Sequence, residues 1–248
     1  MEKHNNNIAI LVDGDNAQAK LLDKILEEVS KYGKVTIRRI YGDWTTPQMN
    51  SWKDLLNDLS FSPMQKFNYT SGKNSTDSSL IIDAMDILHD KAVDGFCIVS
   101  SDSDYTGLAK RIREEGIFVM GVGEKKTPNA FVQSCEIFTY CETLMPKEST
   151  VKGDNGSNKK SAQSDEDDNK TLTKKEYKLI DRAFDMSVDE EVEAYIATVG
   201  QNLRKLNPSF DARDYGFRNL TEMFKHLKTY EVINNNVKGL NHPLVKKK

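Results

Sequence analysis

Short, largely apolar runs separated by stretches of helical periodicity are the feature that most constrains the fold of this chain. Three runs stand out, at Ile8–Val12, Gly95–Ser100 and Ile117–Val122. A strand that is apolar on both faces is typical of a parallel sheet covered by helices. The segments between these runs repeat apolar residues at helical spacing, so strands and helices alternate along the chain. The pattern predicts an α/β domain with a mainly parallel sheet and helices on both faces.

Weaker patterns complete the predicted sheet. Val35–Tyr41 alternates apolar and polar residues as a strand does, Gln65–Tyr69 is a short candidate strand, and Ile137–Tyr140 is a candidate edge strand. A strongly apolar helix is predicted over residues 77–90, and another helix is predicted to stop at Gly116, since glycine commonly follows a helix end.

Shifts in composition divide the chain into three predicted parts, residues 1–145, 146–170 and 171–248. The middle part is almost free of apolar residues and predicts a flexible polar linker, because it cannot bury enough surface to offset its ordering entropy. In the last part, helical spacing precedes a predicted hairpin of Tyr230–Ile233, a turn at residues 234–236, and Val237. Helices followed by a hairpin predict a small winged-helix-like domain.

Several classes of protein are excluded by composition. Three cysteines, Cys97, Cys135 and Cys141, have no zinc-finger spacing and suit a reducing compartment. No apolar run approaches the ~20 residues of a membrane helix, and the first residues lack the apolar core of a signal peptide. We therefore expect a cytoplasmic protein that does not enter a membrane. The nucleoplasm stays an alternative, because the terminal Lys246, Lys247 and Lys248 are too weak a signal to decide. The net charge of −3 does not by itself indicate a binder of polyanions.

Acidic residues follow two of the buried runs directly. Asp13 comes after Ile8–Val12, Asp102 and Asp104 come after Gly95–Ser100, and Asp77 opens the helix of residues 77–90. The carboxyl ends of parallel strands meet at one edge of the sheet, where ligands bind. Carboxylates gathered there repel one another unless a cation or proton compensates, and their oxygens suit Mg²⁺ or Mn²⁺. Such an ion can assist hydrolysis of a phosphodiester.

Each acid also has a plain structural explanation. Asp13 with Gly14 is equally explained as a turn, and Asp15 is better explained as a helix cap than as a catalytic residue. Taken singly, Asp77 is typical of a helix N-terminus, and one of Asp102 and Asp104 fits a cap. Asp83 stays undecided, and Asp86 is expected on the solvated surface. The clustering after two apolar strands is what favours a metal site.

Four segments with these acids resemble the LabA-like branch of the NYN family, which belongs to the PIN-like nuclease superfamily. The resemblance covers roughly residues 8–144, and the ordered set is more specific than any one motif. It implies a PIN-like three-layer α/β/α fold and a metal-dependent ribonuclease. The segments are Ile8–Asn16 (IAILVDGDN), Ser75–Met85 (STDSSLIIDAM), Val99–Tyr105 (VSSDSDY) and Phe118–Ala130 (FVMGVGEKKTPNA).

The resemblance also implies roles for individual residues. Asp13 and Asp102 would hold Mg²⁺ or Mn²⁺, and Asp77 and Asp104 would complete the metal site or orient the attacking water. Asn16 would hydrogen-bond the phosphate or a carboxylate. Ser101 and Ser103 would support the loop or contact phosphate, and Lys73 is a weaker candidate for a phosphate contact.

The C-terminal part carries a second resemblance. Leu203–Val232, which contains NPSFDARDYGFRNLTEMFKHLKTYEV, is similar to the OST-HTH or LOTUS domain, a family that binds RNA or protein partners. Residues 194–248 hold ten Lys/Arg and four Asp/Glu, a local charge of +6. Basic side chains contact nucleic-acid phosphates, although a solvated basic face is the plain alternative. The candidates for RNA contacts are Arg204, Lys205, Arg213, Arg218, Lys225 and Lys228.

These expectations combine into one hypothesis, a ribonuclease that uses Mg²⁺ or Mn²⁺ and holds RNA with its C-terminal domain. The main alternative is a non-catalytic RNA-binding or adaptor protein that retains the acidic pocket. A phosphotransferase with an aspartate nucleophile is disfavoured, since its motif usually continues D-x-D-G-T and this chain reads Asp13-Gly14-Asp15-Asn16.

Overall fold

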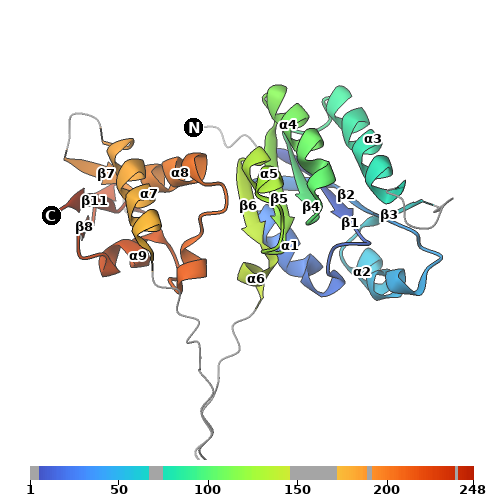
Figure 1. The fold of residues 1–248 in the computed structure, drawn as a ribbon, viewed down its shortest axis with the longest axis horizontal. Helices are drawn as coiled ribbons and strands as arrows, with labels where there is room; N and C mark the ends of the chain where they lie inside the picture. The colour runs from blue at the N-terminus through green and yellow to red at the C-terminus, as the bar shows by residue number, and fades with distance from the viewer. Residues whose placement is uncertain (1–5, 67–74, 146–171, 189–191, 238–239) are drawn as a thin grey trace, which may run out of the picture. The chain divides into compact units, whose positions relative to one another are not determined.

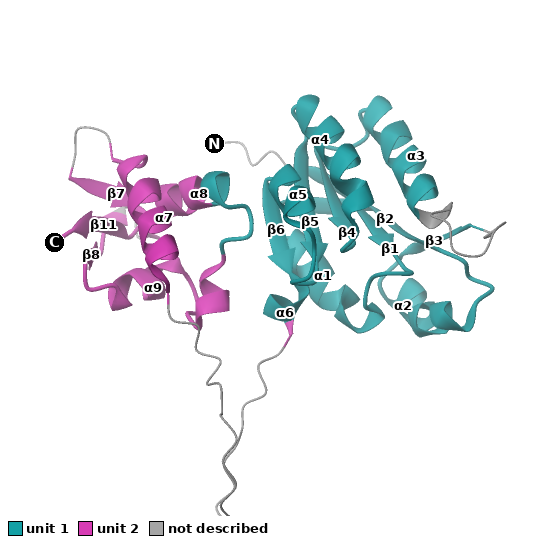
Figure 2. Cartoon of the chain, in the orientation of Figure 1, with its two compact units in different colours: residues 1–144, 204–210 teal, residues 145–203, 211–248 magenta. Residues whose placement is uncertain are grey.

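The structure is a computed structural model, and its chain forms two compact units that Figure 2 colours separately. One unit comprises residues 1–144 with 204–210, and the other comprises residues 145–203 with 211–248. The predicted linker, residues 146–170, lies outside the described residues. The structure describes residues 6–66, 75–145, 172–188, 192–237 and 240–248.

A six-stranded sheet in the order β3-β2-β1-β4-β5-β6 forms the centre of the first unit, and all neighbouring strands run parallel. Strand β4 is buried at every position, as its apolar sequence predicts for a strand covered on both faces. The strands are β1 (Asn7–Asp13), β2 (Lys34–Gly42), β3 (Ser62–Gln65), β4 (Gly95–Val99), β5 (Phe118–Gly123) and β6 (Ile137–Tyr140).

The predicted strand at Gln65–Tyr69 is placed too late in the sequence. Strand β3 ends at Gln65, and residues 67–69 lie outside the described residues. The strand was missed because Pro63 counts against a strand in the sequence, since proline cannot donate a hydrogen bond to a neighbouring strand. The edge position of β3 explains why proline is tolerated: Pro63 pairs with Ile40 of β2, and among the described residues β3 has a neighbouring strand on one side only.

Helices on both faces complete the three layers (Figure 1). Helices α3, α4 and α5 pack against one face, where their apolar residues join Ala9, Leu11, Phe96 and Ile98 in one buried cluster. The chain moves outward from β1 to β2 and β3 before it crosses back to β4, so right-handed crossovers put α1 and α2 on the other face. The helices are α1 (Leu22–Val29), α2 (Lys53–Asp58), α3 (Ser75–His89), α4 (Thr106–Glu114), α5 (Asn129–Ser134) and α6 (Cys141–Leu144), with 3-10 turns η1 (Ala19–Leu21), η2 (Pro47–Trp52) and η3 (Ser103–Tyr105).

The second unit combines helices with an antiparallel three-stranded sheet in the order β7-β11-β8. Thr173 and Glu176 form a reciprocal capping box that starts its first helix, α7. The elements are α7 (Lys174–Asp185), β7 (Glu193–Tyr195), α8 (Ile196–Leu206), η4 (Ala212–Tyr215), α9 (Leu220–His226), β8 (Tyr230–Ile233), β9 (Asn236–Val237), β10 (Leu240–Asn241) and β11 (Leu244–Lys247).

The predicted hairpin is wrong, because Tyr230–Ile233 does not pair with Val237. Strand β8 pairs with β11, and Val237 pairs with Leu240 in a separate short ladder. Sequence periodicity finds strands but does not identify their partners; Val245, buried on β11, pairs with Val232 of β8 and with Ala194 of β7. In the described residues no helix combines the length and the apolar character needed to cross a membrane.

Gly121 on β5 tests how tightly the sheet packs. A Cβ at this position would lie 2.7 Å from Cε2 of Phe138 and 2.8 Å from Sγ of Cys135. We expect Gly121→Ala to lower the free energy of unfolding by about 1–3 kcal/mol through overpacking, as measured by thermal or urea denaturation. Gly107→Ala is the control, since nothing lies within 4 Å of its Cβ and it lies in helix α4. Equal losses in both variants would contradict this account.

Candidate active site

The candidate site lies where the order of the sheet reverses. Strands β1 and β4 are neighbours, with Val12 paired to Val99, and from there the chain extends outward through β2 and β3 on one side and β5 and β6 on the other. In open parallel sheets ligands bind beyond the carboxyl ends of the strands at this switch point. Asp13 ends β1, and Ser100 directly follows β4. The fold therefore brings the two acidic segments to one edge.

Glycine shapes the turn after β1. The backbone N–H of Gly14 donates to the carbonyl of Tyr41 at 2.8 Å, and a Cβ on Gly14 would lie 2.8 Å from the same oxygen. Trp52 donates its indole N–H to the Gly14 carbonyl at 3.2 Å. The backbone of the turn is thus clamped against β2 and η2, which fixes the direction in which Asp13 leaves the strand.

Three carboxylates meet at this edge. One oxygen each of Asp77, Asp102 and Asp104 lies within 4.8 Å of the others. Asp77 is buried in the first turn of α3, Asp102 is half-buried, and Asp104 is exposed. Asp102 is also the N-cap of η3, and its Oδ1 accepts the backbone N–H of Asp104 at 2.9 Å. These three acids, here called the acidic trio, open to solvent on the side of Asp104.

Asp13 lies outside the acidic trio and is fully buried. Its Oδ2 accepts from Nδ2 of Asn16 at 2.8 Å and from Oγ of Ser100 at 2.9 Å. Its Oδ1 is buried and has no hydrogen-bond partner among the described residues. Asn16 therefore binds a carboxylate, which is one of the two roles expected for it. A shared metal role for Asp13 and Asp102 stays a prediction.

Tyr105 is the residue that sequence reasoning missed. It is fully buried at the end of η3, and its hydroxyl donates to Oδ1 of Asp77 at 2.6 Å. Burial first, and then the charges of Asp13 and Asp77, raise the pKa of Tyr105 far above its usual value, so the hydroxyl keeps its proton. Its place directly after Asp104 in the motif VSSDSDY was the available signal.

Ser100 and Ser101 hold the loop that carries the acids. The Ser100 hydroxyl donates to Asp13 and accepts the backbone N–H of Asp102 at 3.1 Å. The Ser101 hydroxyl accepts the backbone N–H of Glu124 at 2.8 Å, which ties the loop after β4 to the loop after β5. Ser101 thus supports the loop, one of its two expected roles. Lys73, the weaker candidate, lies outside the described residues.

Burial raises the pKa of two acids. For Asp13, desolvation outweighs the hydrogen bonds from Asn16 and Ser100, and the nearby charge of Asp77 adds to the increase. For Asp77, desolvation again comes first, opposed by the Tyr105 hydroxyl and reinforced by Asp102 and Asp104. Both groups hold their ionised form at a cost, which a proton or a bound cation would relieve.

The remaining acids, Asp15, Asp83 and Asp86, differ in their surroundings. The cap predicted for Asp15 is wrong, because the N-cap position of η1 is Gln18. Asp83, left undecided, binds Arg39 and the Tyr41 hydroxyl, and so joins helix α3 to strand β2. Asp86 is exposed, as expected.

The basic candidates of the C-terminal unit differ in their surroundings. Arg213 is engaged by Asp211, which accepts from Nε at 3.0 Å and from Nη2 at 2.6 Å. Arg204 is half-buried. The exposed candidates are Lys205, Arg218, Lys225 and Lys228.

Comparison with known families agrees with this geometry. Residues 7–144, more than half of the chain, match the NYN domain family. This chain belongs to the NYN domain family. Residues 168–241 match the OST-HTH/LOTUS domain, so the predicted resemblance of both parts is confirmed. The PIN-like α/β fold predicted for the NYN domain is confirmed as well.

Individual relatives are distant. An uncharacterized protein of Methanocaldococcus jannaschii is 27% identical over 126 residues, which is 49% of this chain and 49% of that protein. The chain therefore spans about half the length of this curated relative. A crystal structure of a protein of unknown function from Vibrio parahaemolyticus aligns with a TM-score of 0.48 at 22% identity, covering 56% of this chain and 95% of the other.

Asp13→Asn should stabilise the metal-free protein at neutral pH by on the order of 1 kcal/mol, because it removes a buried charge and keeps an acceptor for Asn16 and Ser100. When the pKa of a carboxyl is higher in the folded than in the unfolded protein, the free energy of unfolding falls as the pH rises above the unfolded pKa. The difference in free energy of unfolding between the variant and the wild type should therefore be absent near the pKa of Asp13 in the unfolded chain and should grow toward neutral pH. Thermal unfolding in EDTA across this pH range measures it, and a pH-independent difference would contradict it.

Proposed function

We propose that this NYN protein is a metal-dependent ribonuclease that acts in RNA processing or decay and holds RNA with its OST-HTH domain. NYN domains are PIN-like nuclease domains and OST-HTH domains bind RNA, so the two matches support an RNA nuclease. The observation that carries the proposal is the acidic trio, Asp77, Asp102 and Asp104, at the switch point of the sheet. A site of this kind suits hydrolysis of a phosphodiester.

The residues at the edge fit a divalent cation. The acidic trio offers three carboxylate oxygens, which are ligands for hard ions such as Mg²⁺ or Mn²⁺. Asp13 adds a buried Oδ1 without a hydrogen-bond partner among the described residues. The raised pKa of Asp77 fits the same picture, since a cation would favour its ionised form. When bound, such an ion supplies positive charge for the phosphoryl oxygens and acidifies water.

The chain's own residues have separable tasks in this proposal. Tyr105 fixes the Asp77 carboxylate through its hydroxyl, and Ser100 fixes the backbone of Asp102. Asp104 is the exposed member of the acidic trio, and in this proposal its carboxylate would orient the attacking water and accept its proton. Attack of water on phosphorus would leave a 5′-phosphate by analogy with PIN-like enzymes. Asp13 is fully buried, which leaves it too deep to act as a nucleophile in this proposal.

The OST-HTH domain would keep the RNA near this site. Exposed Lys205, Arg218, Lys225 and Lys228 supply charge for phosphate contacts. Because both domains belong to one chain, RNA held by one domain is presented to the other at a raised effective concentration. Protein partners of this domain are a further possibility of the same family.

Divalent cations should stabilise the first unit through the acidic trio. An ion at tenfold its dissociation constant adds about 1.4 kcal/mol to the free energy of unfolding. We expect Mn²⁺ or Mg²⁺ to raise the thermal unfolding midpoint of the wild type, and EDTA to reverse the increase. Asp102→Asn should reduce the response strongly, whereas Asp86→Asn, exposed on α3 and outside the trio, should keep it. Equal responses in all three proteins would place the cation elsewhere.

Cleavage of end-labelled single-stranded and structured RNA in Mg²⁺ or Mn²⁺ tests the function. The wild type and Asp86→Asn should cleave, EDTA should abolish cleavage, and Asp102→Asn should lose at least about 100-fold in rate, the lower range for removing a group that stabilises transition-state charge. No cleavage by the wild type, or equal cleavage by Asp102→Asn, would overturn the catalytic proposal and favour an RNA-binding adaptor.

A further inference from the structure

A hollow of about 370 Å³ adjoins the acidic trio. It shares Asp102 with the trio, so whatever fills it lies next to the proposed reaction site. Segments that follow three neighbouring strands, β1, β4 and β5, contribute to its wall. The lining residues are Asn16, Ser101, Asp102, Ser103, Lys126 and Pro128.

Lys126 is the one cation among these described lining residues. Its ammonium lies 2.7 Å from Oε2 of Glu124, and its side chain is 75% exposed. The nearby Glu124 carboxylate raises the pKa of Lys126, which keeps the ammonium charged. The Glu124 side chain is 24% exposed, so only the lysine side of this ion pair is open to solvent. A pair with one exposed partner contributes little stability, so Lys126 can turn from Glu124 to a phosphate at small cost. Gln18 holds the other oxygen of Glu124 at 2.8 Å.

Neutral donors and an apolar surface line the same hollow as this cation. Ser101 uses its oxygen to accept from Glu124, which leaves the hydroxyl hydrogen to donate. Asn16 gives one of its two amide hydrogens to Asp13 and has a second. Pro128 adds an apolar face. A cation, polar hydrogens and an apolar patch match a phosphate followed by its sugar, and the cation offsets the repulsion that the acids exert on RNA.

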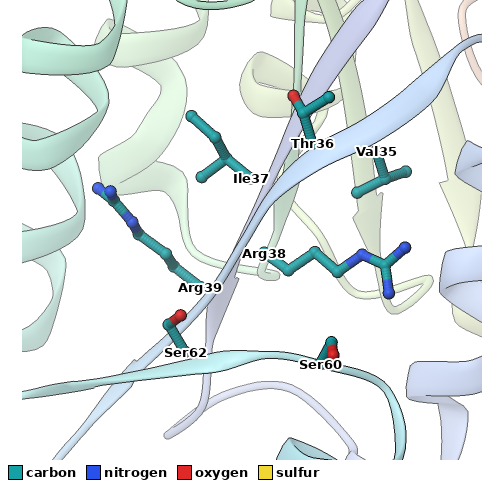
Figure 3. Close-up of a pocket in the computed structure, with 7 residues that line it drawn as sticks. All are labelled: Val35, Thr36, Ile37, Arg38, Arg39, Ser60 and Ser62. Atoms are coloured by element: carbon teal, nitrogen blue, oxygen red, sulfur yellow. The ribbon is translucent and has the colours of Figure 1, made fainter.

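A larger hollow on the same domain lacks this chemistry. It measures about 490 Å³ and lies along the first half of β2, away from the carboxyl edge of the sheet (Figure 3). Its two guanidinium groups are engaged: Arg38 donates to the Leu59 carbonyl at 2.7 Å, and Arg39 is paired with Asp83, with both side chains of that pair largely buried. The lining residues are Val35, Thr36, Ile37, Arg38, Arg39, Ser60 and Ser62.

We infer that Lys126 and the hollow beside Asp102 bind the phosphate of the nucleotide next to the scissile phosphodiester, so that the loop between β5 and α5 guides the RNA strand into the NYN domain. This inference deepens the proposed function and rests on it for the position of the scissile bond. The binding surface itself is testable without any turnover.

The test measures affinity for a labelled single-stranded RNA by fluorescence anisotropy over a range of salt concentrations. The full chain is used, Ca²⁺ replaces Mg²⁺ and Mn²⁺, and the RNA is checked for integrity. Lys126→Met should weaken binding severalfold and flatten the slope of log affinity against log salt by about 0.7, the value for one phosphate contact on a single strand. Glu124→Gln should strengthen binding, because it removes the competitor for Lys126.

Lys125→Met is the matched control, since Lys125 is exposed, directly precedes Lys126 and does not line the hollow. Its slope should equal that of the wild type. Equal slopes for all proteins, or equal losses for Lys125→Met and Lys126→Met, would overturn the inference. A slope change specific to Lys126, in a protein that shows no cleavage in Mg²⁺ or Mn²⁺, would support the RNA site while refuting the nuclease.

Discussion

The buried carboxylate of Asp13 at the end of a central parallel strand is the constraint on which the rest of this site depends. Burying a charge is costly unless polar partners or a cation compensate, and the two hydrogen bonds to Asp13 come from the neutral side chains of Asn16 and Ser100. The adjacent Asp77 adds like charge. The packing of strands β1 and β4, which are almost wholly buried on both faces, supplies stability that offsets this cost. Such local conflict within a well-packed fold is typical of a functional site.

Ser100 and Tyr105 support the acidic trio next to the buried Asp13. The Ser100 hydroxyl donates to Asp13 and accepts from the backbone of Asp102, so the position of Asp102 depends on the same group that solvates Asp13. Tyr105 keeps its proton and fixes Asp77. The acids are thus held by strand ends and helix starts, which are more precise supports than long loops.

The sequence was sufficient for the parts of the fold that follow from local periodicity. The apolar runs at Ile8–Val12 and Gly95–Ser100 predict the central strands, and their position before acidic residues predicts the edge at which the acids meet. The sequence was not sufficient where strand pairing in the folded chain decides the structure. Pro63 is accepted because β3 is an edge strand, and β8 pairs with β11 instead of the predicted partner at Val237. Which acids form the trio was likewise not predictable, because only the packed structure decides that Asp77, Asp102 and Asp104 approach one another while Asp13 lies outside their group.

The net charge of the chain hides a strong difference in charge between its two ends. The net charge is −3, yet residues 194–248 carry +6, which leaves −9 on the first 193 residues. A polyanion is attracted to the basic part and repelled by the acidic part. In the proposed function the acids hold a divalent cation, and RNA would be brought to them by the basic domain of the same chain and by Lys126. Lys126 lines the same hollow as Asp102 and is paired with Glu124. Because the Lys126 side chain is 75% exposed, it would be able to exchange Glu124 for a phosphate as the inference requires.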